Sequence, residues 1–150
     1  MEIENILNAK NGEKTFFLVD DDEDDRYFFL SALKKTNRNS SCIIAKDGEE
    51  ALEYLEKNES FIPDFIFLDL NMPRVTGKEC LVKIRQIERL KDVPICIYST
   101  SSAENDKTET IKLGADDYMI KPNSLNELTE MLSKIILTGE LINKLKNFMF

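Results

Sequence analysis

The sequence predicts an α/β domain of the doubly wound type, in which helices cover both faces of a parallel sheet. Three observations predict it. Five short runs rich in Val, Ile and Phe alternate with segments whose apolar residues recur at helical spacing. The runs are almost continuously apolar, as strands covered on both faces are. The chain of 150 residues is long enough for one domain with its own core.

The elements follow one another as strand and helix, five times. The expected strands are T-F-F-L-V (15–19), S-C-I-I-A (41–45), D-F-I-F-L (64–68), P-I-C-I-Y (94–98) and D-Y-M-I (117–120). The residues expected on the buried helix faces are Phe29, Ala32 and Leu33; Ala51, Leu52 and Leu55; Leu81, Ile84 and Ile87; and Leu125, Leu128, Leu132 and Ile135. Breakers separate the elements, and Gly114 is placed to end one helix. This alternation favours parallel strands joined by right-handed crossovers.

The expected domain covers residues 14–137, preceded by a polar, partly helical lead-in at 1–13. Residues 138–150, T-G-E-L-I-N-K-L-K-N-F-M-F, are expected to form a helical extension that is too short for a DNA-binding module. Two interpretations of this extension stay open. It packs on its own domain as a helix, or its apolar F-M-F end contacts a partner or a second copy.

Composition restricts the possible partners and the compartment. The net charge of −8 argues against binding nucleic acid or an anionic membrane surface. No stretch approaches the roughly 20 apolar residues of a membrane span, and the acidic start M-E-I-E-N-I-L lacks the basic region of a signal peptide. Cys42, Cys80 and Cys96 have no CxxC spacing, which favours reduced, buried thiols in a cytoplasmic protein. The absence of histidine excludes Ser-His-Asp chemistry.

Chemically active side chains follow four of the expected strands. Asp20 and Asp21 follow the first, Asp69 the third, Ser99 the fourth and Lys121 the fifth. Ligands of open α/β sheets bind outside these carboxyl ends. Neighbouring carboxylates repel one another unless a cation lies among them, and Mg²⁺ prefers oxygen ligands and keeps room for a phosphate partner. An aspartate can carry a phosphoryl group as an acyl phosphate, which an ammonium and a hydroxyl can hold.

The other acidic residues after the first strand have a plainer interpretation. Asp22, Glu23, Asp24 and Asp25 are expected to cap the following helix or to lie in solvent, because a helix N-terminus favours acidic side chains.

Four motifs together carry a family resemblance. They are L-V-D-D, F-L-D-L-N-M-P, I-Y-S-T and D-Y-M-I-K-P, each at the end of an expected strand. With them, the sequence resembles the response-regulator receiver domain, the CheY-like family of two-component signalling, over about residues 14–137. The resemblance implies a flavodoxin-like fold with strand order 2-1-3-4-5, counted along the chain.

The resemblance also implies a phosphorylation site that depends on magnesium. Asp69 corresponds to the phosphoacceptor. Asp20 and Asp21 correspond to the acidic pair that holds Mg²⁺ together with Asp69, and Asn71 to the position whose backbone carbonyl completes the metal site.

Further positions correspond to the switch of the family. Ser99 stands at the switch hydroxyl, Tyr118 at the aromatic residue that changes rotamer, and Lys121 at the lysine that contacts the phosphoryl group. The bond between Lys121 and Pro122 corresponds to one that is often cis in the family, and a cis bond is physically plausible only before proline. In the segment R-V-T-G, Thr76 stands where the family often has an acidic residue, and we expect it to cap a helix.

The function implied is a stand-alone receiver that works as a phosphorylation switch. A histidine kinase or a histidine phosphotransfer protein would donate the phosphoryl group. The response would appear on the surface formed by the strand at 117–120 and the helices on either side of it, where a downstream protein or a second copy would bind.

Two alternatives from other classes remain. An aspartyl phosphatase of the haloacid dehalogenase type needs a second acid two residues after its nucleophile, where this chain has Asn71. An adaptor independent of phosphorylation would not need Asp69, Lys121 and Ser99 together. A flavodoxin-like cofactor binder is disfavoured, because the acidic residues after the first strand would repel a phosphate.

Overall fold

The structure is a computed structural model that describes residues 4–5 and 13–141 of the chain. Its elements are β1 (Glu4–Asn5), β2 (Lys14–Val19), α1 (Glu23–Lys35), β3 (Ser40–Ala45), α2 (Gly48–Lys57), β4 (Phe65–Leu68), α3 (Gly77–Arg85), the 3₁₀ turn η1 (Glu88–Leu90), β5 (Ile95–Ser99), α4 (Glu104–Lys112), β6 (Asp117–Ile120) and α5 (Leu125–Thr138). The five expected strands are confirmed, each to within one residue at either end.

The strands form one sheet in the order β1-β3-β2-β4-β5-β6. The five strands from β3 to β6 are parallel, which confirms the predicted order 2-1-3-4-5. The short β1 was not predicted. It pairs antiparallel with β3 at the edge, with Glu4 opposite Ile44, so part of the lead-in is extended where a partly helical segment was expected. Backbone groups of an edge strand are open to such pairing, which overrides a weak local pattern.

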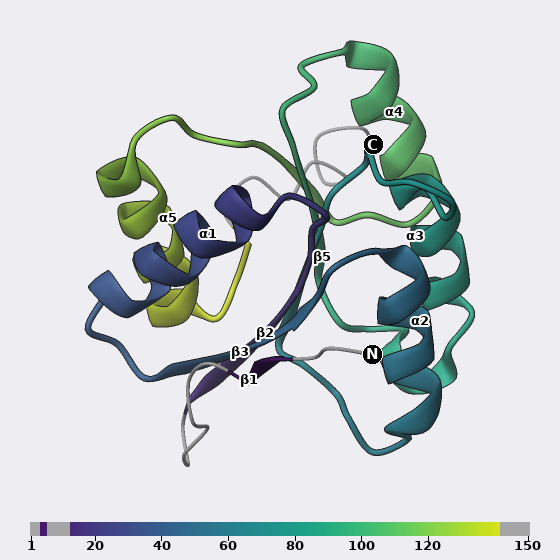
Figure 1. The fold of residues 1–150 in the computed structure, drawn as a ribbon, viewed down its shortest axis with the longest axis horizontal. Coiled ribbons are helices and arrows are strands. Elements are labelled where there is room, and N and C mark those ends of the chain that lie inside the picture. The colour runs from purple at the N-terminus through teal and green to yellow at the C-terminus, as the bar shows by residue number, and fades with distance from the viewer. Residues whose placement is uncertain (1–3, 6–12, 142–150) are drawn as a thin grey trace.

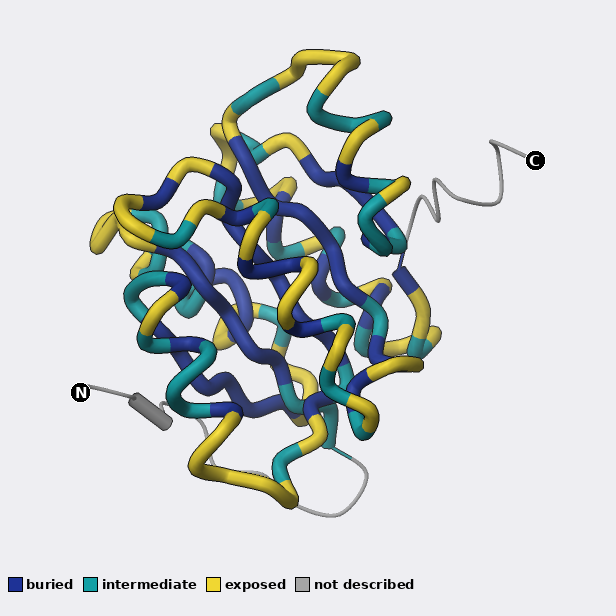
Figure 2. The backbone as a smooth tube through the Cα atoms, turned by 90° about the vertical axis from the view of Figure 1, so that its right-hand side faces the viewer, coloured by how far each residue is buried: buried dark blue, intermediate teal, exposed yellow. Residues whose placement is uncertain are grey.

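Helices cover both faces of the sheet. Figure 1 shows α1 and α5 on one face and α2, α3 and α4 on the other. The strands between them are buried along almost their whole length (Figure 2). One core, between the sheet and the pair α1 and α5, contains an aromatic cluster in which the Phe29 ring lies 5.1 Å from Phe67 and 5.5 Å from Tyr98.

A second core lies on the other face of the sheet, beneath α2 and α3, and most of the expected helix faces point into one of these two cores. The buried members are Phe29, Ala32, Leu33, Ala51, Leu55, Leu81, Ile84, Leu128, Leu132 and Ile135. Leu52, Ile87 and Leu125 pack against the cores but are only partly buried. The three cysteines are free and buried, as expected. Within the described ranges, no helix combines the length and the apolar character needed to cross a membrane.

Helix ends follow the local signals of the sequence. Asp22 caps α1 by accepting a hydrogen bond from the amide of Asp25, and Thr76 forms a capping box with Glu79 at the start of α3. At the other end of the chain, Gly139 has a φ of 72° and follows the last residue of α5. Of the expected C-terminal extension at 138–150, the structure describes residues 138–141, in which Thr138 ends α5 and Leu141 is buried; positions 142–150 lie outside the described residues.

Candidate functional site

Three carboxylates meet where β2 and β4 end. The parallel register pairs Val19 with Leu68, so Asp20 and Asp69, the next residues, leave the sheet side by side. One oxygen from each of Asp20, Asp21 and Asp69 lies within 4.8 Å of the others. Asp20 is fully buried and Asp69 is 5% exposed, whereas Asp21 lies in solvent. The structure thus brings together the three acidic residues that the sequence assigned to one site.

Gly77, the first residue of α3, lies directly against the backbone of Asp69 and Leu70. Its amide donates a hydrogen bond to the Leu70 carbonyl at 2.9 Å. A Cβ atom on Gly77 would lie 2.5 Å from Leu70 Cα and closer still to the Asp69 carbonyl oxygen. The start of α3 therefore packs backbone to backbone against the residue predicted to carry the phosphoryl group.

Lys121 brings an ammonium group into the acidic cluster. Its Nζ lies 2.9 Å from Asp20 Oδ2, 2.8 Å from Asp25 Oδ2 and 3.7 Å from Asp69 Oδ2. Its backbone amide donates to the Ser99 carbonyl at 2.8 Å, which fixes the chain as it leaves β6. The bond to Pro122 is trans, so the cis isomer that is often found in the family is absent from this structure. An X-Pro bond favours trans by about 0.5–1 kcal/mol, and the hydrogen bond to Ser99 forms with that isomer here.

Burial and like charge raise the pKa values of two acidic residues in this cluster. Burial, followed by the neighbouring charge of Asp20, raises the pKa of Asp69 to about 7, although Lys121 opposes the shift. Burial likewise raises the pKa of Asp20, with Lys121 again opposing. For Lys121, burial would lower the pKa, but the hydrogen bond to Asp25 and the charges of Asp20 and Asp69 outweigh it and raise the pKa above its usual range. Without a further cation, burial therefore favours the protonated forms of Asp20 and Asp69 despite the nearby ammonium.

The donor set fits a divalent cation with oxygen ligands. Asp20 Oδ2 is buried and has no hydrogen-bond partner in the described part of the chain, although it lies within ion-pair distance of Lys121. A buried carboxylate oxygen without a hydrogen bond is costly unless another positive group reaches it. Asp20, Asp21 and Asp69 offer carboxylate oxygens, the type of ligand that Mg²⁺ prefers. The role of the Asn71 backbone carbonyl as a further metal ligand stays a prediction.

The two predicted switch residues meet at a residue that the sequence did not single out. Ser99 is buried at the end of β5, and its Oγ accepts a hydrogen bond from the Ser101 amide at 3.1 Å. Tyr118 is 4% exposed, and its hydroxyl donates to the Ser101 carbonyl at 2.8 Å. The Ser101 hydroxyl donates to Asp106 in the first turn of α4 at 2.7 Å. No pattern in the sequence predicts these loop contacts.

Asp25 has a different role from the one expected. The capping of α1 is done by Asp22, to which Asp25 contributes only its backbone amide, at 2.9 Å. The Asp25 side chain instead turns to Lys121, which stands 96 positions further along the chain. A contact of this sequence separation leaves no local signal.

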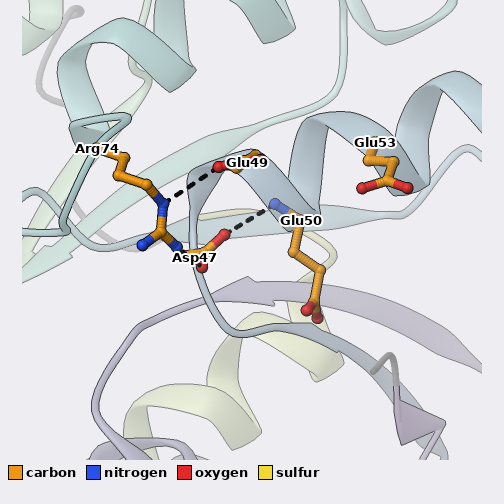
Figure 3. A pocket seen from close by; sticks show the side chains of 5 residues that line it. All are labelled: Asp47, Glu49, Glu50, Glu53 and Arg74. Atoms are coloured by element: carbon orange, nitrogen blue, oxygen red, sulfur yellow. Dashed lines mark hydrogen bonds and ion pairs between the residues drawn. The ribbon is translucent and has the colours of Figure 1, made fainter. Parts of the chain in front are cut away.

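A second acidic hollow of about 440 Å³ lies beside α2 (Figure 3). It is lined by Asp47, Glu49, Glu50, Glu53 and Arg74. Arg74 adopts a left-handed φ of 65° and forms ion pairs with Asp47 at 2.8 Å and Glu49 at 3.2 Å. These ion pairs connect the loop after Asp69 to the start of α2, and the guanidinium of Arg74 neutralises part of the negative charge of the hollow.

Comparison with known proteins agrees with this geometry. A family model described as the response regulator receiver domain matches residues 16–133. The chain belongs to this family. Among curated relatives, response regulator Rcp1 of Synechocystis is 31% identical over 132 residues, which are 85% of this chain and 90% of Rcp1. The probable methanogenesis regulatory protein FilR2 of Methanothrix harundinacea is 33% identical over 93 residues, and the chain covers 60% of it.

Solved structures of receivers share the fold. The Mn²⁺-bound form of Rcp1 superposes with a TM-score of 0.71 at 32% identity, covering 81% of this chain and 91% of that one. The phosphorylated cyanobacterial phytochrome response regulator RcpA gives a TM-score of 0.73 at 31% identity, covering 82% and 91%. These matches confirm the family and the doubly wound fold, and this receiver is therefore a component of two-component signalling.

Proposed function

We propose that this receiver takes a phosphoryl group onto Asp69 from a phosphohistidine of a histidine kinase or a histidine phosphotransfer protein, in a reaction that depends on Mg²⁺. The observation that carries the proposal is the meeting of Asp20, Asp21 and Asp69 within 4.8 Å, with Lys121 beside them. The Mn²⁺-bound Rcp1 and the phosphorylated RcpA support it, because both are relatives at more than 30% identity.

In the proposed reaction, a carboxylate oxygen of Asp69 attacks the phosphorus of the donor. The new P–O bond forms as the P–N bond breaks, and the imidazole leaves with the electron pair of that bond. Lys121 can donate an N–H to a phosphoryl oxygen, because its Nζ lies only 3.7 Å from Asp69 Oδ2. When bound, Mg²⁺ would supply the positive charge that keeps the carboxylates ionised and neutralises the phosphoryl oxygens. Water that later attacks the same phosphorus releases inorganic phosphate and restores the Asp69 carboxylate.

The proposed response runs through Ser99 and Tyr118. Ser99 Oγ is held by the Ser101 amide, so a move toward the phosphoryl group would break that bond and release the loop before α4. The Tyr118 hydroxyl is held by the same residue, so its contact would change together with the loop. The surface of α4, β6 and α5 would then bind a downstream protein or form a homodimer. The free, buried cysteines accord with a cytoplasmic setting for this switch.

The test is intact-protein mass spectrometry after incubation with phosphoramidate, with and without Mg²⁺, on wild type and on Asp69→Ala. We expect a phosphoryl adduct in the wild type only, and only when Mg²⁺ is present. If neither phosphoramidate nor a phosphorylated kinase produced an adduct, the chain would act as an adaptor independent of phosphorylation.

A further inference from the structure

Asp25 is the one acidic side chain of α1 that the structure joins to Lys121. Its Oδ2 lies 2.8 Å from Lys121 Nζ, a hydrogen bond between the first turn of α1 and the end of β6. The Lys121 side chain is 9% exposed and that of Asp25 is 38% exposed. The ammonium end of the bridge is thus shielded from water, where a charge-assisted hydrogen bond is stronger than on an open surface.

The bridge is one of three carboxylate contacts that the ammonium group makes. An ammonium has three N–H donors. One of them is donated to Asp25 Oδ2 at 2.8 Å, and Asp20 Oδ2 forms an ion pair with the same nitrogen at 2.9 Å. The third carboxylate is that of Asp69. Its Oδ2 lies 3.7 Å from Lys121 Nζ, which is beyond hydrogen-bond distance. The ring of Tyr98, with its centroid 5.5 Å from Nζ, borders the same nitrogen.

We propose that Asp25 is a positioning residue that holds Lys121 back from Asp69 and leaves one ammonium hydrogen for an oxygen of the incoming phosphoryl group. The inference rests on the proposed function. Without Asp25, the ammonium is pulled by Asp20 and Asp69 alone and closes on Asp69. A direct Lys121–Asp69 hydrogen bond would occupy the attacking oxygen and fill the space that a phosphoryl oxygen needs, so the transfer would slow.

The experiment compares Asp25→Asn with Asp24→Asn as a matched control. Both variants remove one negative charge from the first turn of α1. Asp24, however, is exposed, and among the described residues the ion pairs of Lys121 are with Asp20, Asp25 and Asp69, not with Asp24. The first readout is the rate of phosphorylation by phosphoramidate at saturating Mg²⁺, below the melting temperature of every variant. The second is the ¹⁵N NMR signal of the Lys121 ammonium in metal-free, unphosphorylated protein, assigned with Lys121→Arg.

We expect Asp25→Asn to be phosphorylated about tenfold more slowly, equivalent to about 1.4 kcal/mol in activation free energy, and to show a displaced Lys121 signal. Asp24→Asn should change neither readout, and Asp25→Glu, which restores the carboxylate, should recover most of the rate. A wild-type rate in Asp25→Asn overturns the proposal. So does a slower rate with an unmoved Lys121 signal, because the charge alone would then explain it.

The two readouts also separate this inference from the proposed function. A wild-type chain that takes no phosphoryl group would overturn the proposed function and the positioning role with it, while the NMR signal would still report whether the bridge between Asp25 and Lys121 exists. A phosphorylated wild type with an unaffected Asp25→Asn would overturn the positioning role alone.

Discussion

Replacing Gly77 with alanine tests the packing of α3 against the residue predicted to be phosphorylated. The new Cβ would lie 2.5 Å from Leu70 Cα, which is 0.9 Å (3.4 − 2.5) inside ordinary van der Waals contact, and closer still to the Asp69 carbonyl oxygen. Both atoms belong to the backbone, so neither can yield by a change of rotamer. Overpacking costs about 1–3 kcal/mol, and such backbone contacts place Gly77→Ala near the upper end. Better helix propensity returns up to about 1 kcal/mol.

The expected net loss is about 2 kcal/mol, or a fall in Tm of roughly 4–8 °C at about 2–4 °C per kcal/mol. Thermal unfolding followed by circular dichroism would measure it, and urea unfolding would give the free energy. Gly48→Ala is the matched control, because Gly48 also begins a helix but its Cβ would meet Val75 no closer than 3.0 Å. We expect Gly48→Ala to change Tm by less than half as much. The reasoning is refuted if Gly77→Ala melts within about 1 °C of wild type, or if the two variants lose equal stability.

Four further outcomes are expected. Arg85→Met should cost about 3 kcal/mol in urea unfolding, because it leaves Asp116, now 2.7 Å from the guanidinium, without that charge partner; an unchanged midpoint would contradict this. Thr76→Ala should cost about 1 kcal/mol through loss of the α3 cap, and Thr76→Ser should retain most of it. Burial raises the pKa of Cys80 to about 12, so Ellman's reagent should not modify this thiol in folded protein between pH 7 and 9, only after unfolding. In metal-free protein, the raised pKa of Asp69, about 7 when folded against 3.8 as its ordinary value, disfavours the folded state as pH rises through that interval, so Asp69→Asn should raise Tm more at pH 8 than at pH 5; equal shifts at both pH values would rule out this account.

The sequence by itself determined the strands and the residues of the acidic site. Continuous apolar runs that alternate with helical segments are typical of a parallel sheet between helices, and the five runs became β2, β3, β4, β5 and β6. In such a sheet, residues that follow neighbouring strands must share one edge. Asp20 and Asp69 therefore lie together because Val19 is paired with Leu68, a consequence of fold class that needs no knowledge of side-chain contacts.

Only the tertiary structure decided which of the many acidic residues reach Lys121 and how the switch residues are held. Asp25 looked like its capping neighbours, but its place on α1 faces the end of β6 once both helices and sheet are packed. Ser101 joins Ser99, Tyr118 and α4 through a loop whose path has no periodic pattern. The pairing of β1 was missing for the same reason. Each depends on groups brought close in space from distant parts of the chain, whereas hydrophobic periodicity and turn signals report only on the neighbours of a residue along the sequence.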